Sequence, residues 1–534
     1  MSTHSTRPRR PAEERPPAGA AVTLRYHERT KHSYTSVRRE AYALDWANQP
    51  SPYKRYLEAE RLPLPRAVPG DLLPTLELLR RLAEPDSQQP RGQVDLAELS
   101  ALCQLGYGIT AQKVSPGLVT YLRAAPSAGA LFPCELYVCL RGVEGVADGL
   151  YHYAPDDHSL SCLRQGDLLP TLRAAAGDHP ALAGADVVLA ISAIWWRSGW
   201  KYHDRAYRYC LHDTGHLAGN LLLAGQALGC QPAVVYDFVD GEVNRLLGLD
   251  ERREAALALV ACRSDGSGAA RTSARPPLPV IAPAYRPLSP REVTYPLILE
   301  AHAASGLADV QALAAARRRK PAKAALAGGE AQFAFPLPDP TAAHSVQPLP
   351  ETIARRRSSR EFAGQPISTA ALSALLAATV VGYRSDQAVL PPLDVAVIVN
   401  GVEGMEPGAY RYDAARHRLV QIREGDLRTW AAYLSLEQQL CGNAAASVFL
   451  LADLEGLAAQ GGERAYRRTH IEAGLRGEFI YLAGRALGLG CSGIGAFYDD
   501  QVAEFFEAPP GSGVIYELVV GLESSDERVA VHNF

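Results

Sequence analysis

The 534-residue sequence predicts an α+β fold in which two copies of one domain are fused and pair within the chain. Two distant stretches align without a gap: ELYVCLRGVEGVADGLYHYAPDDHSLSCLRQGDL from Glu135 and DVAVIVNGVEGMEPGAYRYDAARHRLVQIREGDL from Asp394, a separation of 394 − 135 = 259 residues. The same separation relates Tyr207 to Tyr466 and Gly215 to Gly474. A repeat this long is a whole domain rather than a solenoid unit, so we expect an intrachain pseudo-dimer.

Each copy contains the same order of predicted elements. An amphipathic helix (LAELSALCQL or TAALSALLAATV) precedes an extended apolar segment (ELYVCL or DVAVIV), a turn and a short strand pair. A long helix follows, GHLAGNLLLAGQALG or GLRGEFIYLAGRALG, whose Ala and Gly spacing indicates close helix packing. We expect a disordered tail at 1–21, a first domain at 22–265, a linker with up to one helix at 266–345 and a second domain at 346–534.

The composition excludes several classes of function. The content of 47% hydrophobic and 21% charged residues is typical of a soluble globular protein. A net charge of −4 offers no overall attraction to nucleic acid or an anionic membrane, and we find no secretory signal or membrane segment. The nine cysteines show neither a C-x-x-C pair nor zinc-site spacing, which favours a reducing, cytoplasmic compartment. A small-molecule or peptide partner fits better.

Arginines and a serine open the second copy. The run from Arg355 to Phe362, RRRSSREF, resembles the R-R-S-x-R-x-F signature of nitroreductase-family domains. Guanidinium groups bind a phosphate dianion through paired hydrogen bonds. The resemblance implies a fold of two nitroreductase-like domains and a cofactor, FMN, whose phosphate and ribityl chain are held by Arg356, Arg357, Ser358 and Arg360. An Arg-rich, solvated helix start is the alternative for this motif alone.

Two glycine-containing segments resemble flavin contacts. APSAGALFP from Ala125 is similar to the P-S-x-G-x-x-x-P loop of the SagB/ThcOx dehydrogenase branch, and GLGCSGIG from Gly488 resembles the family's glycine-rich segment near the ring. Small residues let the backbone approach a flat ring closely. A turn before a strand and a helix-ending glycine cluster are the alternatives. The resemblance implies cofactor contacts from Pro126, Ser127, Ala128, Gly129, Gly490, Ser492, Gly493, Ile494 and Gly495.

Lys201 and Tyr202 lie in WRSGWKYHDRAYR, which resembles the Lys-Tyr segment of azoline dehydrogenases. In those enzymes the Lys-Tyr pair is catalytic, so the resemblance implies the same role here. A lysine whose pKa is lowered by burial can abstract a proton while hydride leaves to flavin. The alternative is a surface cation beside an interface aromatic residue.

The two copies have lost complementary parts of this set. Before LAELSALC the first copy reads PDSQQPRGQVD, without the phosphate-binding arginines, and it lacks the glycine-rich segment. The separation of 259 places Asp386 and Ala388 opposite Ser127 and Gly129, and Gln460 and Gly461 opposite Lys201 and Tyr202. Because nitroreductase-type sites draw on both subunits of a dimer, one composite site is expected and its mirror image is expected to be inactive.

The most favoured function is an FMN-dependent dehydrogenase of the SagB/ThcOx type, oxidising a substrate such as an azoline in a modified peptide, with oxygen as acceptor, within a biosynthetic complex. One alternative is an NAD(P)H-dependent reductase of nitro, quinone or ene compounds, in which NAD(P)H binds transiently over the flavin. Another is a flavin-free peptide-binding scaffold. A zinc hydrolase ranks third, because His212 and His216 are four apart on a helix but lack an evident third ligand, so no metal is expected.

Overall fold

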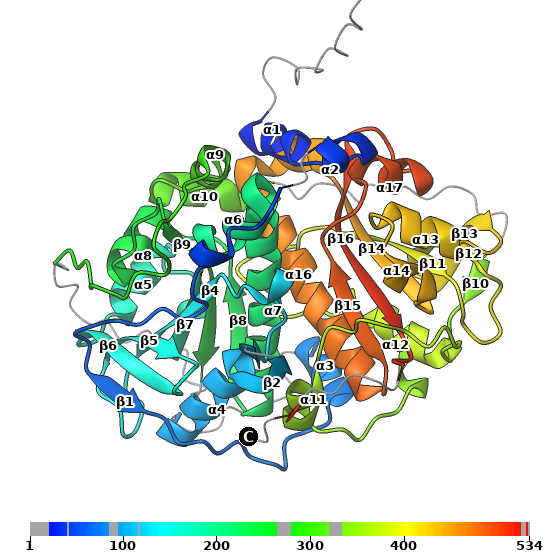
Figure 1. The fold of residues 1–534 in the computed structure, drawn as a ribbon. Coiled ribbons are helices and arrows are strands. Elements are labelled where there is room, and N and C mark those ends of the chain that lie inside the picture. Colours follow the sequence, from blue (N-terminus) through cyan, green and yellow to red (C-terminus); the bar gives the residue numbers. More distant parts are fainter. Residues whose placement is uncertain are drawn as a thin grey trace, which may run out of the picture.

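Two antiparallel sheets of seven strands form the body of the protein (Figure 1), seen in a computed structural model that describes residues 21–39, 42–84, 94–115, 118–263, 279–319, 334–524 and 530–531. The expected tail, apart from Ala21, and parts of the expected linker lie outside these residues. The first sheet contains, in spatial order, β1 (Arg61–Pro63), β6 (Ser159–Gln165), β5 (Gly149–Ala154), β4 (Cys134–Leu140), β7 (Ala185–Ile194), β9 (Glu254–Arg263) and β8 (Gln231–Val235). The second contains β10 (Ala334–Pro336), β13 (Arg418–Glu424), β12 (Gly408–Asp413), β11 (Asp394–Val399), β14 (Ala446–Asp453), β16 (Ser512–Gly521) and β15 (Gly490–Ile494).

The two sheets repeat each other in register as well as in order. Leu136 of β4 pairs with Ile191 of β7, and Val395 of β11 pairs with Leu450 of β14, so both partners keep the separation of 259 residues. The prediction of an α+β fold with two similar domains is therefore confirmed.

Helices cover both sheets and fill the centre. The first copy contains α3 (Thr75–Leu82), α4 (Leu96–Tyr107), α5 (Leu169–Ala175), α6 (Trp195–Tyr202), α7 (Ala206–Ala227) and α8 (Asp240–Leu247). The second contains α11 (Leu349–Arg355), α12 (Thr369–Ala378), α13 (Arg428–Leu434), α14 (Gln439–Asn443), α15 (Leu454–Gly456), α16 (Glu463–Ala486) and α17 (Asp499–Phe505). The expected amphipathic helices are α4, which begins with a capping box of Asp95 and Glu98, and α12, which is capped by Ser368.

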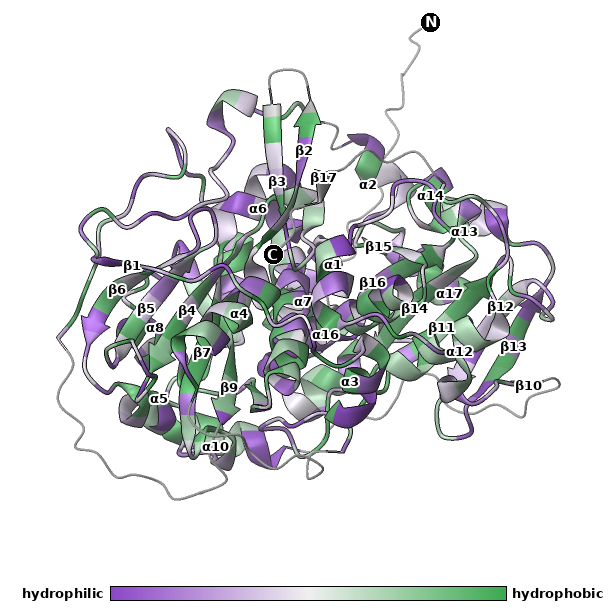
Figure 2. Cartoon of the chain, turned by 90° about the horizontal axis from the view of Figure 1, so that it is seen from below, coloured by the Kyte–Doolittle hydropathy of each residue, from purple (hydrophilic) through white to green (hydrophobic). Residues whose placement is uncertain are grey.

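The ends of the chain connect the copies. In a third, smaller sheet, β2 (Ile109–Ser115) pairs with β3 (Leu118–Arg123) and with β17 (Ala530–Val531), and the β2–β3 hairpin projects from the body (Figure 2). The C-terminal segment of the second copy therefore adds a strand to the first copy. Near the other end of the chain, α1 (Val22–Arg29) and α2 (Tyr34–Arg39) lie across the top of both copies (Figure 1).

Residues 266–345, expected as a linker, contain regular structure. Helices α9 (Pro296–Ala304) and α10 (Val310–Arg318) lie beside the first sheet, and strand β10 joins the second sheet by pairing with β13. Arg317 of α10 donates to the carbonyl oxygens of Ala176 and Asp237 at 3.0 and 3.1 Å. The segment is thus built into both copies.

The long central helices α7 and α16 pack directly against each other (Figure 1). A Cβ atom on Gly215 would lie 2.0 Å from the carbonyl oxygen of Ile471, and one on Gly474 would lie 2.1 Å from that of His212. These two contacts are each other's image, because 212 + 259 = 471 and 215 + 259 = 474. The glycines permit the close packing that their spacing predicts.

We expect Gly474→Ala to destabilise the protein by about 1–3 kcal/mol, because the added methyl group forces the helices apart. Gly484→Ala is the matched control on the same helix, since its Cβ would lie 3.6 Å from Leu375, an ordinary contact, and alanine favours a helix interior. Thermal unfolding of the three proteins checks this. Equal melting temperatures for Gly474→Ala and the wild type would show that the helices are not in tight contact.

Two pairs of buried arginines join the copies through a pseudo-twofold relation. Arg205 and Arg208 of the first copy contact Asp499 at 2.9 and 2.7 Å. Arg464 and Arg467 of the second copy contact Asp240 at 3.0 and 2.6 Å. Each residue and its image are separated by 259 positions, so the expected intrachain pseudo-dimer is confirmed.

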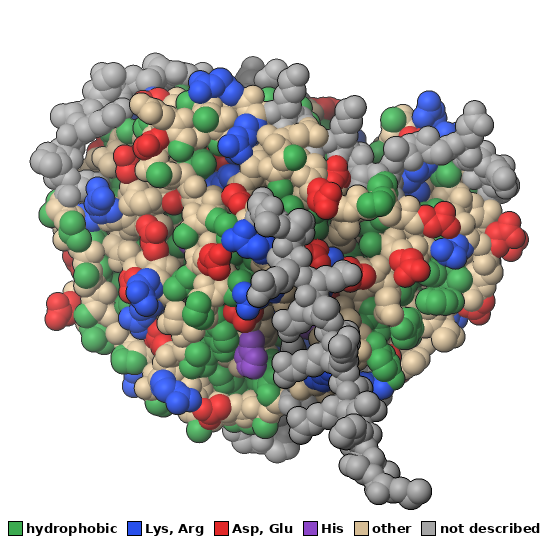
Figure 3. All heavy atoms as spheres, turned by 90° about the horizontal axis from the view of Figure 1, so that it is seen from above, with side chains coloured by type: hydrophobic (Ala, Val, Ile, Leu, Met, Phe, Trp, Pro, Cys, Tyr) green, Lys and Arg blue, Asp and Glu red, His purple; other side chains and the backbone are tan. Residues whose placement is uncertain are grey.

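Within the described part of the chain, no helix is both long and apolar enough to cross a bilayer. On the face shown in Figure 3, acidic and basic side chains are interspersed.

Candidate functional site

A small cleft, with a cavity volume of about 80 Å³, opens between the two copies. Both copies contribute to its walls. The first copy supplies Pro126, Ser127, Ala128, Gly129, Tyr209, His212, Asp213 and His216, and the second supplies Ser358, Arg360, Tyr481, Ser492, Gly493, Gly495 and Tyr516. The cleft thus brings together nine of the residues that the sequence predicted as cofactor contacts.

The loop of Pro126 to Gly129 is held by its own side chains and by α7. The Ser127 hydroxyl accepts from the Phe132 amide at 2.8 Å, and the Ala128 amide donates to the Asp213 carboxylate at 3.3 Å. Gly129 has φ = 62°, a conformation that favours glycine. A Cβ there would lie 2.7 Å from the Tyr202 hydroxyl oxygen and 3.3 Å from Lys201 Nζ. The glycine therefore brings the loop against the Lys-Tyr pair.

Lys201 and Tyr202 end α6 directly behind Gly129 and do not themselves line the cleft. Burial is the main cause that lowers the pKa of Lys201, and the charge of Arg360 lowers it further. Burial raises the pKa of Tyr202 well above its usual value, so the phenol stays protonated. Arg360 belongs to the second copy, so the electrostatics of this pair depend on both copies.

Arg356 and Arg357 lie behind the cleft, at the junction with the first copy. Arg356 donates to the carbonyl oxygens of Ala124 and Arg123 at 2.8 and 3.1 Å, and Arg357 donates to Thr110 Oγ1 at 3.2 Å. Arg356 Nη1 and Arg357 Nε are buried without a hydrogen-bond partner in the described residues. Both arginines therefore lie at the interface between the copies, and each has an N–H group that could donate a hydrogen bond to a ligand.

The glycine-rich segment forms β15, at the edge of the second sheet next to the arginine run. The Ser359 amide donates to the Cys491 carbonyl at 2.9 Å, and the Ser358 hydroxyl lies 2.8 Å from that of Tyr481. A Cβ on Gly490 would lie 2.3 Å from Ser359 Oγ, so this glycine admits the arginine run rather than the cofactor.

Ile494 also points away from the cleft. Its side chain packs in an apolar cluster with Phe362 and Val519. Of the expected glycine-rich contacts, Ser492, Gly493 and Gly495 remain at the cleft.

The polar floor of the cleft consists of residues that the sequence did not assign to the cofactor, although it offered His212 and His216 as possible zinc ligands. It consists of Tyr209, His212, Asp213, His216, Tyr481 and Tyr516. Both ring nitrogens of His212 and Oδ2 of Asp213 have no hydrogen-bond partner in the described residues, and burial raises the pKa of Asp213 to about 7. The separation of 259 relates His212 and His216 to the apolar residues Ile471 and Leu475. This difference between the copies is the feature of the sequence that could have identified the two histidines as part of the cleft.

The two histidines weighed as zinc ligands have other surroundings. His216 is 2.7 Å from Glu478 and 2.9 Å from the Tyr516 hydroxyl, while the His212 ring stacks on Tyr516 with centroids 4.5 Å apart. Among the described residues, no group of three or more His, Cys, Asp or Glu side chains is placed to hold a metal ion.

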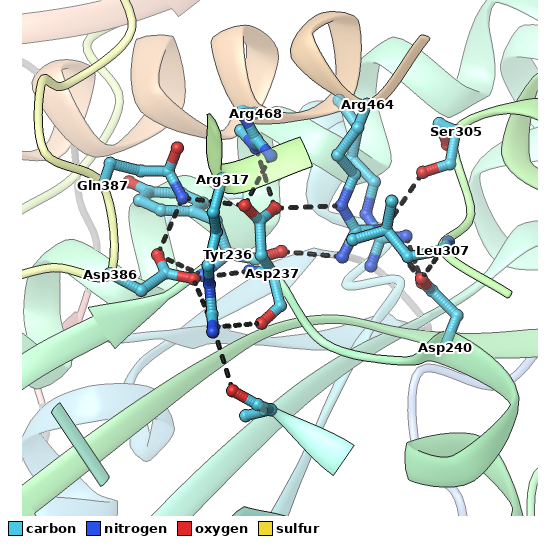
Figure 4. Close-up of polar contacts among 12 residues, drawn as sticks. Tyr236, Asp237, Asp240, Ser305, Leu307, Arg317, Asp386, Gln387, Arg464 and Arg468 are labelled. Atoms are coloured by element: carbon cyan, nitrogen blue, oxygen red, sulfur yellow. Dashed lines mark hydrogen bonds and ion pairs between the residues drawn. The ribbon is translucent and has the colours of Figure 1, made fainter. Parts of the chain in front are cut away.

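At the mirror-image position an ion-pair network joins the two copies (Figure 4), beside a hollow of about 80 Å³ that Asp386, Gln387 and Arg468 help to line. Asp386, the counterpart of Ser127, accepts from the backbone amides of Tyr236 and Asp237 at 2.9 and 2.8 Å. Asp237 in turn accepts from Arg468 Nε at 2.8 Å. Arg464 donates to the Tyr236 carbonyl at 2.7 Å. Side chains of this chain thus occupy the positions that would face a second cofactor.

The N-terminal segment supports the composite cleft from outside. The Tyr42 hydroxyl donates to the Lys201 carbonyl, and its ring stacks on His203 with centroids 3.9 Å apart. The indole of Trp200 donates to the Asp45 carbonyl at 2.9 Å. Residues near 42–46 therefore hold the end of α6 that carries the Lys-Tyr pair.

Comparison with known proteins agrees with this architecture. The profile of the Nitroreductase family matches residues 90–262 and 353–522. A solved structure from Anabaena variabilis, described as a nitroreductase, has 31% sequence identity and a TM-score of 0.74, covering 94% of this chain and 100% of that one.

Two further relatives align with shorter stretches of the chain. A Methanocaldococcus jannaschii protein described as a nitroreductase is 35% identical over 156 residues, 29% of this chain and 75% of that protein. The microcin B17-processing protein McbC of Escherichia coli is 29% identical over 148 residues, 27% of this chain and only about half (54%) of McbC. The family match covers more than half of the chain, so the protein belongs to the Nitroreductase family and carries two copies of its domain.

Proposed function

We propose that this protein is an FMN-dependent dehydrogenase of the SagB/ThcOx type, which removes two hydrogens from a substrate such as an azoline ring in a modified peptide. The observation that carries the proposal is the composite cleft. There, the loop of the first copy, with the Lys-Tyr pair behind it, meets Ser358, Arg360 and the glycines of the second. Family membership supports an oxidoreductase, and the cleft gives it one complete site.

The residues of the cleft fit FMN. Burial, with the charges of Arg356 and Arg485, lowers the pKa of Arg357 to about 9. A phosphate dianion would relieve this repulsion and accept from the unpartnered donors of Arg356 and Arg357, with Ser358 beside them. Gly129 and Gly495 admit two tyrosines at the cleft, because a Cβ on Gly129 would lie 2.7 Å from the Tyr202 hydroxyl oxygen and one on Gly495 would lie 2.2 Å from the Tyr209 ring. Bound there, FMN would supply a two-electron, hydride-accepting group.

The Lys201 amine would accept the proton that the substrate loses in this reaction. Aromatising an azoline removes two electrons and two hydrogens, one as a hydride and one as a proton. Because burial and Arg360 lower the pKa of Lys201, more of the neutral amine is present to accept that proton. The protonated Tyr202 phenol lies beside it, where it can donate a hydrogen bond to the substrate. Oxygen would take up the electrons.

Two relatives support a peptide substrate. McbC is described as processing microcin B17. TfxB of Rhizobium leguminosarum, described as trifolitoxin-processing, is 29% identical over 140 residues, 38% of its length. The second candidate is an NAD(P)H-dependent reductase, which is favoured by the relatives described as nitroreductases.

Substrate assays with the FMN-loaded protein separate the two candidates. An azoline-containing peptide incubated in air should lose two hydrogens, detected by mass spectrometry, without added NAD(P)H. If the flavin is instead reduced rapidly by NAD(P)H and reoxidised by nitro or quinone compounds, with the azoline peptide unchanged, the reductase replaces the dehydrogenase.

A further inference from the structure

A buried chain of three side chains runs from the interface to the floor of the composite cleft. Glu478 of α16 lies 2.7 Å from Nδ1 of His216, and Nε2 of His216 lies 2.9 Å from the Tyr516 hydroxyl. The three side chains come from α16, α7 and β16, and their exposed fractions are 0%, 1% and 7%. A carboxylate, an imidazole and a phenol are thus connected in series, and both His216 and Tyr516 line the cleft.

Two glycines make room for this chain. A Cβ on Gly493 would lie 1.9 Å from the Tyr516 hydroxyl oxygen, at the cleft wall. A Cβ on Gly477 would lie 2.8 Å from the Tyr516 ring and 2.9 Å from the His216 ring. Buried polar groups lower stability unless they are fully hydrogen-bonded. The packing around them therefore preserves an arrangement with an energetic cost.

The mirror-image cleft lacks all three groups. Along the paired helices, 216 + 259 = 475 and 478 − 259 = 219 give Leu475 and Gly219 as counterparts of His216 and Glu478. Tyr516 pairs with Leu450, whose counterpart Ile191 pairs with Ala258, so the strand register relates Tyr516 to Ala258. A structural role shared by the two domains would place polar groups in both. The chain occurs only in the cleft that has the predicted cofactor contacts.

The Tyr516 hydroxyl lies between Nε2 of His216 and the cleft. Burial raises the pKa of Tyr516 well above its usual value, so it remains a phenol with one proton. Oε1 of Glu478 is buried without another partner in the described residues. A proton on Nε2 of His216 would be donated to the Tyr516 oxygen and would leave the phenol proton to point into the cleft.

We propose that Glu478 and His216 position the Tyr516 hydroxyl as a hydrogen-bond donor into the cofactor cleft, where it favours the reduced, more negatively charged form of the flavin. This inference rests on the proposed function, since it requires FMN in this cleft. Tyr516 is the group that contacts the cofactor, and Glu478 and His216 are positioning residues. Asp213 and Tyr481 also face Tyr516 and remain unchanged in the test.

The reduction potential of the bound flavin tests this proposal in a double-mutant cycle. Tyr516→Phe is expected to lower the potential by about 30 mV, which corresponds to a tenfold change in equilibrium constant for a two-electron couple. Glu478→Gln is expected to shift it in the same direction, because Tyr516 then turns back towards His216. The double variant should shift no further than Tyr516→Phe alone, because Glu478 acts through Tyr516.

The direction of the Glu478→Gln shift excludes a simple charge effect, since removing a buried negative charge alone would raise the potential. Tyr236→Phe is the matched control. Its hydroxyl donates to the Glu472 carboxylate at 2.8 Å at the mirror-image position, outside the composite cleft, so the variant should lose a similar bond without changing the potential. Variants that retain FMN poorly are measured after reconstitution with excess FMN.

An unchanged reduction potential in Tyr516→Phe, a higher potential in Glu478→Gln or additive shifts would overturn the proposed roles of Glu478, His216 and Tyr516. These results would not contradict an FMN-dependent enzyme. Wild-type protein that binds no FMN would overturn the proposed function, and with it the proposed role of Tyr516. A lower reduction potential in both single variants, with no further shift in the double variant, supports the proposal.

Discussion

Lys201→Ala is expected to lower turnover of the azoline substrate by about 10²–10⁴-fold, the usual contribution of a general base, while FMN content stays unchanged. Lys201 lies against Gly129 behind the cleft wall, with its pKa lowered by burial and by Arg360, so it can accept a proton without holding the cofactor. The measurement is steady-state turnover together with flavin absorbance per chain. Lys113→Ala, at an exposed lysine of β2, is the control.

The pH profile adds a second readout of the same variant. Lysine acts as a base only when it is neutral, so the wild-type rate should rise with pH through the pKa of Lys201 and then level off. The lowered pKa moves this rise to lower pH than for an ordinary lysine. Lys201→Ala should lose the rise. If Lys201→Ala turns over at the wild-type rate with the same pH dependence, Lys201 is not the general base.

Arg357→Ala is expected to weaken FMN binding by about ten- to a hundredfold, because a hydrogen bond to a charged group contributes roughly 1.5–3 kcal/mol. Arg357 is positioned by Thr110 and has a buried Nε free for a phosphate oxygen. The measurement is titration of the apo-protein with FMN and, in parallel, with riboflavin, which lacks the phosphate.

The neighbouring Arg355→Ala is the matched control, because Arg355 is exposed and pairs with Glu351 at 3.1 Å. It should bind FMN like the wild type. If Arg357→Ala weakens FMN and riboflavin equally, Arg357 does not act through the phosphate, and its loss disturbs the interface with the first copy instead.

The repeat separation predicted most of the architecture. It located both domains and the central helices, and the small-residue pattern indicated their close contact, which Gly215 and Gly474 provide. Short elements were harder to predict: β10 has three residues and gains its stability from pairing with β13, which no local pattern reveals. For the same reason 266–345 was expected to be mostly linker, although α9, α10 and β10 lie within it.

The cleft was predicted in part. Motifs located the loop at Ser127, the arginine run and the glycine segment, because these carry recognisable residue types. They did not show that Gly490 accommodates Ser359 or that Ile494 packs in the core, since both depend on which face of β15 meets the arginine run. His216 and Tyr516 could not be connected from sequence, because they are 300 residues apart and meet only where the copies pair.

The ion-pair network at the mirror-image position gives a physical reason for the complementary losses. The sequence indicated only that Asp386 replaces Ser127, and a carboxylate there would repel a phosphate. In the structure the same carboxylate is bound by two backbone amides, and Arg468 and Arg464 hold the adjacent Asp237 (Figure 4). Removing one partner from such a buried network costs about 3–5 kcal/mol. Opening this cleft for a second cofactor is therefore unfavourable.

The number of flavins per chain tests the composite site most directly. The purified protein, saturated with FMN and freed of excess, is analysed by absorbance of released flavin against protein concentration. One FMN per chain is the expected result, because one cleft has the predicted cofactor contacts and its image is crossed by buried ion pairs. Two per chain would contradict the composite site, and a protein that cannot be loaded with FMN would contradict the flavin enzyme and leave a peptide-binding scaffold.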